Sequence, residues 1–406
     1  MNKGEITEVA EVVGKKKAAK EASSCILEMA KRKGKVGRLE VALAAIITLF
    51  SVSTLAIAAS APSAAEWEKT VAAAKREGKV VVIGPHGNET RDALIDGFQR
   101  KYPEIQVEHS GMAGAQMPPR LLADQKAKLY SIDLLVQGAG SVISGLLPVK
   151  AIIPIKPFMV GPNAVDASAW LNKRFNFTDE SGQYILAMSA HIMPPFAYNM
   201  TMVSPKEIAS WTDLLAPKWK GKLAIRDPRM SGGGLANATC WYANPKLGKE
   251  FIRKLFGSQE VALIRDDRQL LDFVGHQKYP IAIGPNSVLV KELMGKGVPV
   301  REYNPEALQE IAVTTAGNGT LSVPLNPPHP NALKVYIDYL LSKQGQTEWS
   351  KATGYPSLRR DVPHDQDGEH LILIPKEGMQ YFDSNLERHV NMRAEVVDFL
   401  NTIVGR

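Results

Sequence analysis

Residues 226–235 read RDPRMSGGGL, so three consecutive glycines stand between a short apolar run and a second apolar segment. Glycine loses more conformational freedom on folding than any other residue, so the run needs a structural or functional reason. The preceding residues 223–225 predict a buried strand, and a helix is expected from about Gly233, with Ser231 at its N-cap position. The first N–H groups of a helix are unpaired and lie at the positive end of its dipole. The stretch therefore predicts a strand–loop–helix unit whose loop is either a turn or an anion-binding site.

The same alternation of strand and helix extends along most of the chain. Upstream, strands are predicted over 79–84, 105–110 and 131–140, and helices over 65–78, 89–103 and 117–128. A second alternation begins near residue 204, and a long amphipathic helix is predicted over 331–353. This rhythm is typical of α/β proteins with parallel sheets. We expect two α/β lobes, with the chain crossing between them at about 191–200 and again at about 314–324.

The basic excess of the chain is concentrated in its first 40 residues. They hold ten Lys and Arg against six Glu, which leaves a net charge of only +3 for the rest of the chain. The basic segment 29–40 precedes an apolar run over 41–57 and small residues at A-x-A spacing, a pattern typical of a secretory signal peptide. We expect cleavage after Ala58, Ala61 or Ala64, with Met29 as the true initiator. The alternative is an uncleaved membrane anchor.

Composition and motifs exclude several classes of protein. A near-neutral body has no basic footprint for nucleic acid. Removal of the leader would leave Cys240 without its only counterpart, Cys25, so no intrachain disulfide is expected. The sequence contains no G-x-S-x-G, H-E-x-x-H, Walker or C-x-x-C motif. The neighbours Asp266 and Asp267 would point in opposite directions in an extended segment, which disfavours shared acid–base work. We therefore expect no enzymatic activity and no cofactor.

Several stretches resemble the extracellular solute-binding proteins of ABC importers, in the branch similar to ferric-iron-binding proteins. The most specific stretch is SWTDLLAPKWKGK (210–222) with the DP and SGGG that follow it, and others are TRDALIDGFQRKYPEIQVE (90–108), RDDRQLLDFVGHQKYPIAIGP (265–285) and LSKQGQTEWSKATGYPSLRRDVP (341–363). The resemblance covers roughly residues 65–363. It implies two α/β lobes joined by crossover segments, which close over a ligand in the cleft and then dock on a membrane permease.

The domain boundaries combine the periodicity with this resemblance. We expect a leader with its signal peptide over residues 1–64 and the first part of lobe 1 over 65–195. Lobe 2 is expected over 196–316. Residues 317–406 are expected to return to lobe 1 and to end in a helical tail.

Candidate ligand contacts in lobe 2 follow its predicted strands. In ferric-binding relatives the matching Ser-Gly turn holds a small anion, so the resemblance assigns this role to Ser231, Gly232 and Gly233. Arg229 and Arg265 could pair with a carboxylate or a phosphate, and the alternative for both is a solvated arginine or a surface ion pair. Asn286, after the strand predicted over 279–285, is a neutral donor that fits an organic anion.

Candidate contacts from lobe 1 follow its first and third strands. They are Pro85, His86, Asn88 and Glu89 in one loop, Gly140 and Ser141 in another, and Tyr198 at the crossover. The ferric-binding relatives place an adjacent tyrosine pair where this chain has Gly284–Ser287, and the sequence contains no Tyr-Tyr pair. No metal site is therefore expected.

The sequence as a whole predicts a periplasmic receptor for an ABC importer. It would capture a small organic anion, such as a phosphonate, a sugar phosphate or a carboxylate, by lobe closure. Its partner would be an ABC permease in the inner membrane, and the receptor is expected to be a monomer that binds no nucleic acid. The alternatives are a ferric-iron receptor with a synergistic anion and a two-lobed enzyme resembling porphobilinogen deaminase.

Overall fold

The computed structural model of the chain describes residues 63–363 and 373–405. The expectations for the leader up to residue 62, including Met29 and the cleavage points after Ala58 and Ala61, lie outside the described residues. Within the described residues, no helix combines the length and the apolar composition needed to cross a bilayer. The described residues form one compact unit.

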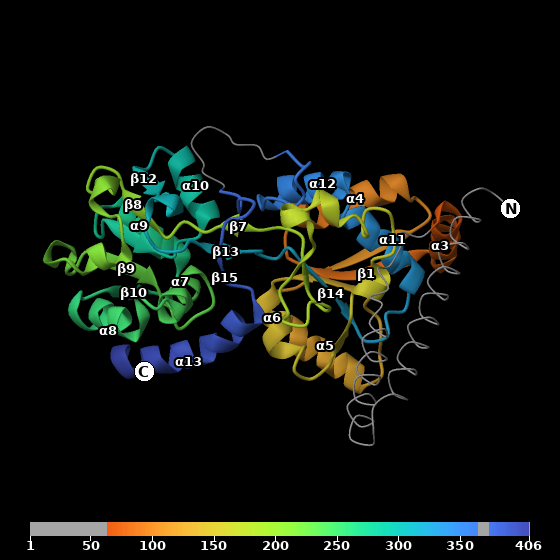
Figure 1. Ribbon diagram of the computed structural model, residues 1–406, viewed down its shortest axis with the longest axis horizontal. Helices are drawn as coiled ribbons and strands as arrows, with labels where there is room; N and C mark the ends of the chain where they lie inside the picture. Colours follow the sequence, from red (N-terminus) through yellow and green to blue (C-terminus); the bar gives the residue numbers. More distant parts are fainter. Residues whose placement is uncertain (1–62, 364–372, 406) are drawn as a thin grey trace, which may run out of the picture. The chain divides into compact units, whose positions relative to one another are not determined.

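Lobe 1 is built on a seven-stranded sheet in the order β2-β1-β3-β14-β6-β5, with β4 paired to β14 (Figure 1). Its strands are β1 (Lys79–Gly84), β2 (Gln106–Gly111), β3 (Leu134–Gln137), β4 (Ile152–Ile153), β5 (Asn176–Phe177), β6 (Leu186–Ala187) and β14 (Thr320–Pro324). Strands β1, β2 and β3 are parallel, and β14 joins β3 in the antiparallel sense. The predicted strand over 79–84 is confirmed, because a β-branched run between Gly78 and Pro85 leaves no other choice.

Helices cover both faces of this sheet. One face packs against α3 (Ala64–Glu77), α4 (Asn88–Lys101), α11 (Pro330–Leu340) and α12 (Lys343–Thr353), and the other against α5 (Met117–Lys126) and α6 (Ala139–Gly145). Side chains of a strand alternate between faces, so Val80 and Val82 enter the first core and Ile83 enters the second.

Lobe 2 is a five-stranded sheet in the order β10-β9-β11-β8-β12. The strands are β8 (Phe196–Asn199), β9 (Leu223–Arg226), β10 (Ala262–Ile264), β11 (Ile281–Ile283) and β12 (Val300–Glu302). One face packs on α7 (Gly233–Ala243) and α8 (Gly248–Ser258), and the other on α9 (Asp267–Gly275) and α10 (Ser287–Gly295). The two-lobed α/β fold predicted from the sequence is thereby confirmed.

A third, three-stranded sheet lies where the chain passes between the lobes. Strands β7 (His191–Ile192) and β13 (Val313–Thr315) are antiparallel, and β15 (Phe382–Asp383) adds to β13 in parallel. We call this the hinge sheet. Its first two strands lie within or beside the segments 191–200 and 314–324, where crossings are expected, and the third comes from the C-terminal segment.

The C-terminal helix α13 (Glu387–Val404) packs against both lobes. Val390 lies in the core of lobe 1 that α5 and α6 cover, whereas Val396 and Leu400 are fully buried in the core of lobe 2. Figure 1 shows α13 running from beside α6 along the lower side of lobe 2. The tail expected to follow the return to lobe 1 thus joins the two lobes.

Two local predictions are wrong. The single helix predicted over 331–353 is two helices, because Ser342 caps α12 by accepting from the N–H of Gly345, while the carbonyl of Leu341 accepts from Arg359 Nη1 at 2.8 Å. The predicted strand over 131–140 is shorter, since α6 already begins at Ala139. Gly140 and Ser141 therefore lie in the first turn of a helix.

Candidate functional site

Strands β9, β10 and β11 of lobe 2 are parallel, so their carboxyl ends share one edge of the sheet. The helices α7, α9 and α10 begin directly after them. The carboxyl edge of such a sheet is where ligands bind in α/β proteins. We call it the lobe 2 edge, and it holds Arg229, Ser231, Gly232, Gly233, Arg265 and Asn286 of the predicted site.

The glycine run at this edge has a structural reason. A Cβ on Gly233 would lie 2.6 Å from the carbonyl oxygen of Gly284, and one on Gly234 would lie 1.9 Å from that of Arg226. The start of α7 therefore packs directly on the backbone that ends β9 and β11. Gly232, with φ of 141°, is the N-cap of α7 and makes no side-chain cap, so the prediction of Ser231 as the N-cap is wrong. Ser231 and Gly232 are exposed and Gly233 is half-buried.

A buried carboxylate organises the arginines of the lobe 2 edge. Asp227 accepts from Arg229 Nε at 2.9 Å and from Arg229 Nη2 at 2.8 Å, and Arg265 Nε lies 3.7 Å away from it. These contacts with Arg229 hold the pKa of Asp227 below its usual range. Arg229 Nη1 also donates to the carbonyl of Gly405 at 2.8 Å, beyond the end of α13. Arg229 is thus engaged with the protein, while the side chain of Arg265 is 76% exposed.

Two more predicted residues serve the fold of lobe 2. The side-chain oxygen of Asn286 accepts from the N–H of Val288 at 3.0 Å and so caps α10, a helix that the sequence analysis did not predict. Tyr198 pairs with Ile281 at the start of β11, so it lies toward the opposite edge from Gly284 and is not brought to the lobe 2 edge. Its ring contacts Tyr303, and burial raises its pKa.

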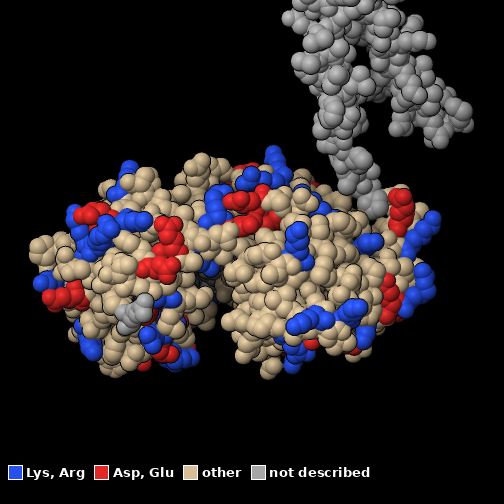
Figure 2. All heavy atoms as spheres, turned by 90° about the horizontal axis from the view of Figure 1, so that it is seen from below, with Lys and Arg blue, Asp and Glu red and all other residues tan. Residues whose placement is uncertain are grey.

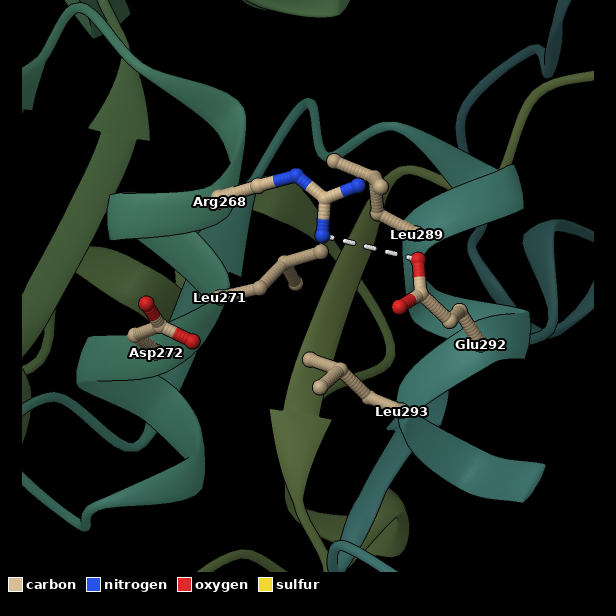
Figure 3. A pocket seen from close by; sticks show the side chains of 6 residues that line it. All are labelled: Arg268, Leu271, Asp272, Leu289, Glu292 and Leu293. Carbon is tan, nitrogen blue, oxygen red and sulfur yellow. Dashed lines mark ion pairs between the residues drawn. The ribbon is translucent and has the colours of Figure 1, made fainter. Parts of the chain in front are cut away.

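Arg268 lies in the first turn of α9, and its side chain lines a pocket of about 80 Å³ between α9 and α10 (Figure 3). Its Nη1 is 3.6 Å from the carboxylate of Glu292 on α10, the ion pair drawn in the figure. Leu271, Leu289 and Leu293 form the apolar wall of this pocket. It is much smaller than the pockets of about 300–1,000 Å³ that hold small-molecule ligands.

The lobe 1 edge, at the carboxyl ends of β1, β2 and β3, holds the other predicted residues. His86 is exposed, and a Cβ on Gly111 at the end of β2 would lie 3.1 Å from its Nδ1. Asn88 and Glu89 are exposed in the first turn of α4, whereas Pro85 is half-buried. Ser141 points toward Gly114, where an added Cβ would lie 2.6 Å from its Oγ.

Sequence reasoning missed the residues that the hinge and α13 bring beside the lobe 1 edge. Arg393 of α13 lies against Gly140, and its Nη2 donates to the carbonyl of Ser384 at 2.6 Å. His191 of the hinge sheet stacks on Tyr355, and burial lowers its pKa to about 4. No local motif marks these residues, because their partners lie far away in the sequence.

A larger cavity, of about 1010 Å³, lies against the hinge sheet. Thr314 and Ser189 line it together with Arg174, Asp383 and Arg388. None of the ligand residues predicted from the sequence lines it. Successive residues of a strand face opposite sides, so Thr315 points to the other side of the hinge sheet from this cavity. Figure 2, from below, shows a hollow between the two lobes, with basic and acidic side chains interspersed on both.

The chain is similar to known proteins over most of its length. Residues 166–355 match the family of bacterial extracellular solute-binding proteins. A Trichodesmium protein (IdiA, FutA), solved in complex with iron and citrate, shares 18% identity and a TM-score of 0.62 over 81% of this chain and 99% of its own. AfuA from Actinobacillus pleuropneumoniae, solved with fructose-6-phosphate, shares 16% identity and a TM-score of 0.57 over 81% and 99%. A putative extracellular solute-binding protein from Bordetella parapertussis shares 13% identity and a TM-score of 0.64 over 81% and 100%.

Proposed function

We propose that this protein captures a small organic anion between its lobes for an ABC importer. Residues 166–355 match the family of bacterial extracellular solute-binding proteins, which supports this proposal. The anion would be a phosphonate, a sugar phosphate or a carboxylate. The protein would be exported to the periplasm by its cleaved leader and would deliver the solute, as a monomer, to a permease of the inner membrane.

The observation that carries this proposal is the start of α7 at the lobe 2 edge. The first amide groups of this eleven-residue helix have no partner within the helix, and they lie at the positive end of its dipole. Exposed Ser231 and Gly232 leave the approach to them open. Arg265 adds an exposed cation after the neighbouring strand. An anion is the ligand that these groups recognise together.

The solved relatives set the range of solutes to be tested. The Trichodesmium protein was solved with iron and citrate, and AfuA with fructose-6-phosphate. Both ligand sets contain an organic anion, and the first also contains a metal ion. The choice between an organic anion and ferric iron is therefore the decisive one for this protein.

The proposal is tested by thermal unfolding of the purified full chain with fructose-6-phosphate, citrate, inorganic phosphate and ferric citrate. A ligand that binds only the native state raises the midpoint temperature of unfolding. At a ligand concentration a hundredfold above Kd it adds about 2.7 kcal/mol to the free energy of unfolding. We expect a shift with at least one iron-free anion. A shift with ferric citrate alone, together with a visible charge-transfer band, would instead assign the protein to iron uptake.

Two arginines on one segment provide a matched pair of variants. Arg265→Gln and Arg268→Gln each remove one cation with a mostly exposed side chain, 76% and 68% respectively. Arg265 follows β10 at the lobe 2 edge, whereas the side chain of Arg268 pairs with Glu292 between α9 and α10. Arg265→Gln should therefore weaken anion binding, while Arg268→Gln should leave it unchanged. Equal affinities for both variants would remove Arg265 from the site.

A further inference from the structure

We propose that Arg393, on the C-terminal helix α13, is the cation that contacts the bound anion from the lobe 1 side of the cleft. The inference rests on the proposed function and names a residue outside the segment 166–355 that matches the family. It also assigns a binding role to a helix that the sequence predicts only as a C-terminal tail.

The guanidinium of Arg393 lies beside Gly140 at the lobe 1 edge. A Cβ added to Gly140 would lie 2.9 Å from Arg393 Nη1, so the side chain approaches the backbone of the lobe 1 edge closely. Its Nη2 donates to Ser384, and the N–H of Ser384 donates to Thr314 of the hinge sheet. The guanidinium therefore lies where the lobe 1 edge meets the hinge, which is where a solute held between two lobes would rest.

The guanidinium of Arg393 has a backbone carbonyl as its hydrogen-bond partner. Its one hydrogen bond among the described residues is to the carbonyl of Ser384, and no carboxylate of these residues lies within the ion-pair distance of 4.0 Å. Burial lowers its pKa, and the charge of Asp383 opposes that effect from farther away. Burial also raises the pKa of Asp383. A partly buried guanidinium without a paired anion is unfavourable, and an anionic ligand would relieve that cost.

Two other arginines of the cleft differ from Arg393 in their partners. Arg229 is held by Asp227 through two hydrogen bonds and by the carbonyl of Gly405. Arg226 lies 3.2 Å from the carboxylate of Asp267, and its side chain is only 12% exposed. These two guanidinium groups already have carboxylate partners, whereas Arg393 has a carbonyl alone.

Arg393 is partly exposed, and the helix that carries it contacts both lobes. Gly140, Ser141 and Arg393 are all half-buried, so each keeps part of its surface exposed to solvent. Arg393 belongs to a helix whose Val396 and Leu400 are anchored in the core of lobe 2, yet it lies against lobe 1. An anion bound to Arg393 would therefore interact with both lobes and would favour their approach.

The test is the affinity of Arg393→Gln, measured by isothermal titration of the full chain with fructose-6-phosphate, citrate and inorganic phosphate. Loss of a charge-assisted contact should weaken binding roughly ten- to hundredfold. Arg393→Lys keeps the positive charge but loses the planar set of guanidinium donors. Its affinity should lie between those of the wild type and Arg393→Gln. Urea unfolding of each variant without ligand shows whether the fold is retained.

Arg388→Gln is the matched control, because Arg388 is an exposed arginine of the same helix that faces the large cavity. It should bind all three probes as the wild type does. If Arg393→Gln binds the probes as tightly as the wild type does, the proposed role of Arg393 is overturned. If Arg388→Gln alone weakens binding, the ligand binds in the large cavity instead. If the wild type binds none of the probes, the proposed function itself fails, and the inference fails with it.

Discussion

The guanidinium of Arg229 and the carboxylate of Asp227 form two parallel hydrogen bonds, of 2.9 and 2.8 Å, two residues apart in the sequence. Asp227 is 1% exposed, and its own N–H donates to Ile264 of the neighbouring strand. Because Arg229 also reaches the carbonyl of Gly405, the pair connects the lobe 2 edge to the end of α13. The arginine predicted as a ligand clamp thus has a structural role that can be measured.

Asp227→Asn should destabilise the protein by about 3 kcal/mol at neutral pH, because it leaves the cation of a mostly buried pair without its anion. The pKa of Asp227 is depressed in the folded state, so its contribution is present above the unfolded pKa and is lost as the pH falls through the folded pKa. The deficit of the variant in urea unfolding should therefore shrink below about pH 4.

The control for this variant is Glu104→Gln, which removes one partner of the exposed Lys75–Glu104 pair. Exposed pairs contribute at most about 1 kcal/mol, so this change should be small. A deficit of Asp227→Asn that stays constant from pH 7 to pH 3 would show that the ion pair is not its cause.

Gly234→Ala should destabilise lobe 2 by about 1–3 kcal/mol or more, since the new Cβ would lie 1.9 Å from the carbonyl oxygen of Arg226. Backbone on both sides has to move to admit it. Gly257→Ala is the comparison, because Gly257 lies in α8 with nothing within 4 Å of an added Cβ. That change should stabilise the protein by about 0.5–1 kcal/mol. Circular dichroism melts of both variants decide whether packing or helix propensity governs the glycine run.

The stability of lobe 2 should fall as the pH rises from about 4.5 to about 7, because burial raises the pKa of the Glu302 carboxyl from the first value to the second. An acid whose pKa is raised in the folded state stabilises fully below its unfolded pKa, and this contribution disappears above the folded one. Up to about 3 kcal/mol is lost over that range. Glu302→Gln should remove this dependence and should be more stable than the wild type at pH 8.

Urea unfolding at pH 5 and pH 8 measures this effect. Glu260→Gln is the control, since Glu260 is 69% exposed and pairs with Lys220 at the surface. If the stability of Glu302→Gln changes between pH 5 and pH 8 as much as that of the wild type, the result contradicts the assignment to Glu302.

Cys240 should resist alkylation in the native protein, because it is 3% exposed and burial raises the pKa of its thiol to about 12. The thiolate is the reactive form, so little of it exists at neutral pH. In the full chain carrying Cys25→Ser, iodoacetamide should label the thiol only after urea is added, as mass spectrometry would show. Rapid labelling without urea would mean that α7 opens locally.

Much of the fold follows from local sequence. The β-branched run 79–84, the helix near 88–101 and the helix from Gly233 match the structure closely, because each has a clear period and clear ends. Helix α10 was missed because the preceding Gly-Pro-Asn-Ser stretch is typical of a loop, although its Asn286 is an N-cap. The break between α11 and α12 was missed because the helical period continues through Leu341.

The candidate site follows from sequence only in part. The position of a residue after a strand places it at an edge of a sheet, which located Arg229, Ser231 and His86. Whether a guanidinium is already partnered depends on residues far away in the chain. Arg229 meets Gly405 across 176 residues, and Arg393 meets Gly140 across an even longer separation.

The sequence by itself therefore determined the two α/β lobes, their crossings and the strand edges that carry the candidate residues, because hydrophobic period and turn residues act over a few positions. Only the tertiary structure decided that the glycines after β9 serve backbone packing against Gly284. It likewise decided that Asp227 takes Arg229 and that α13 brings Arg393 to the lobe 1 edge. The physical reason is that charge pairing and close packing depend on distances in space, and these are set by the docking of elements distant in sequence.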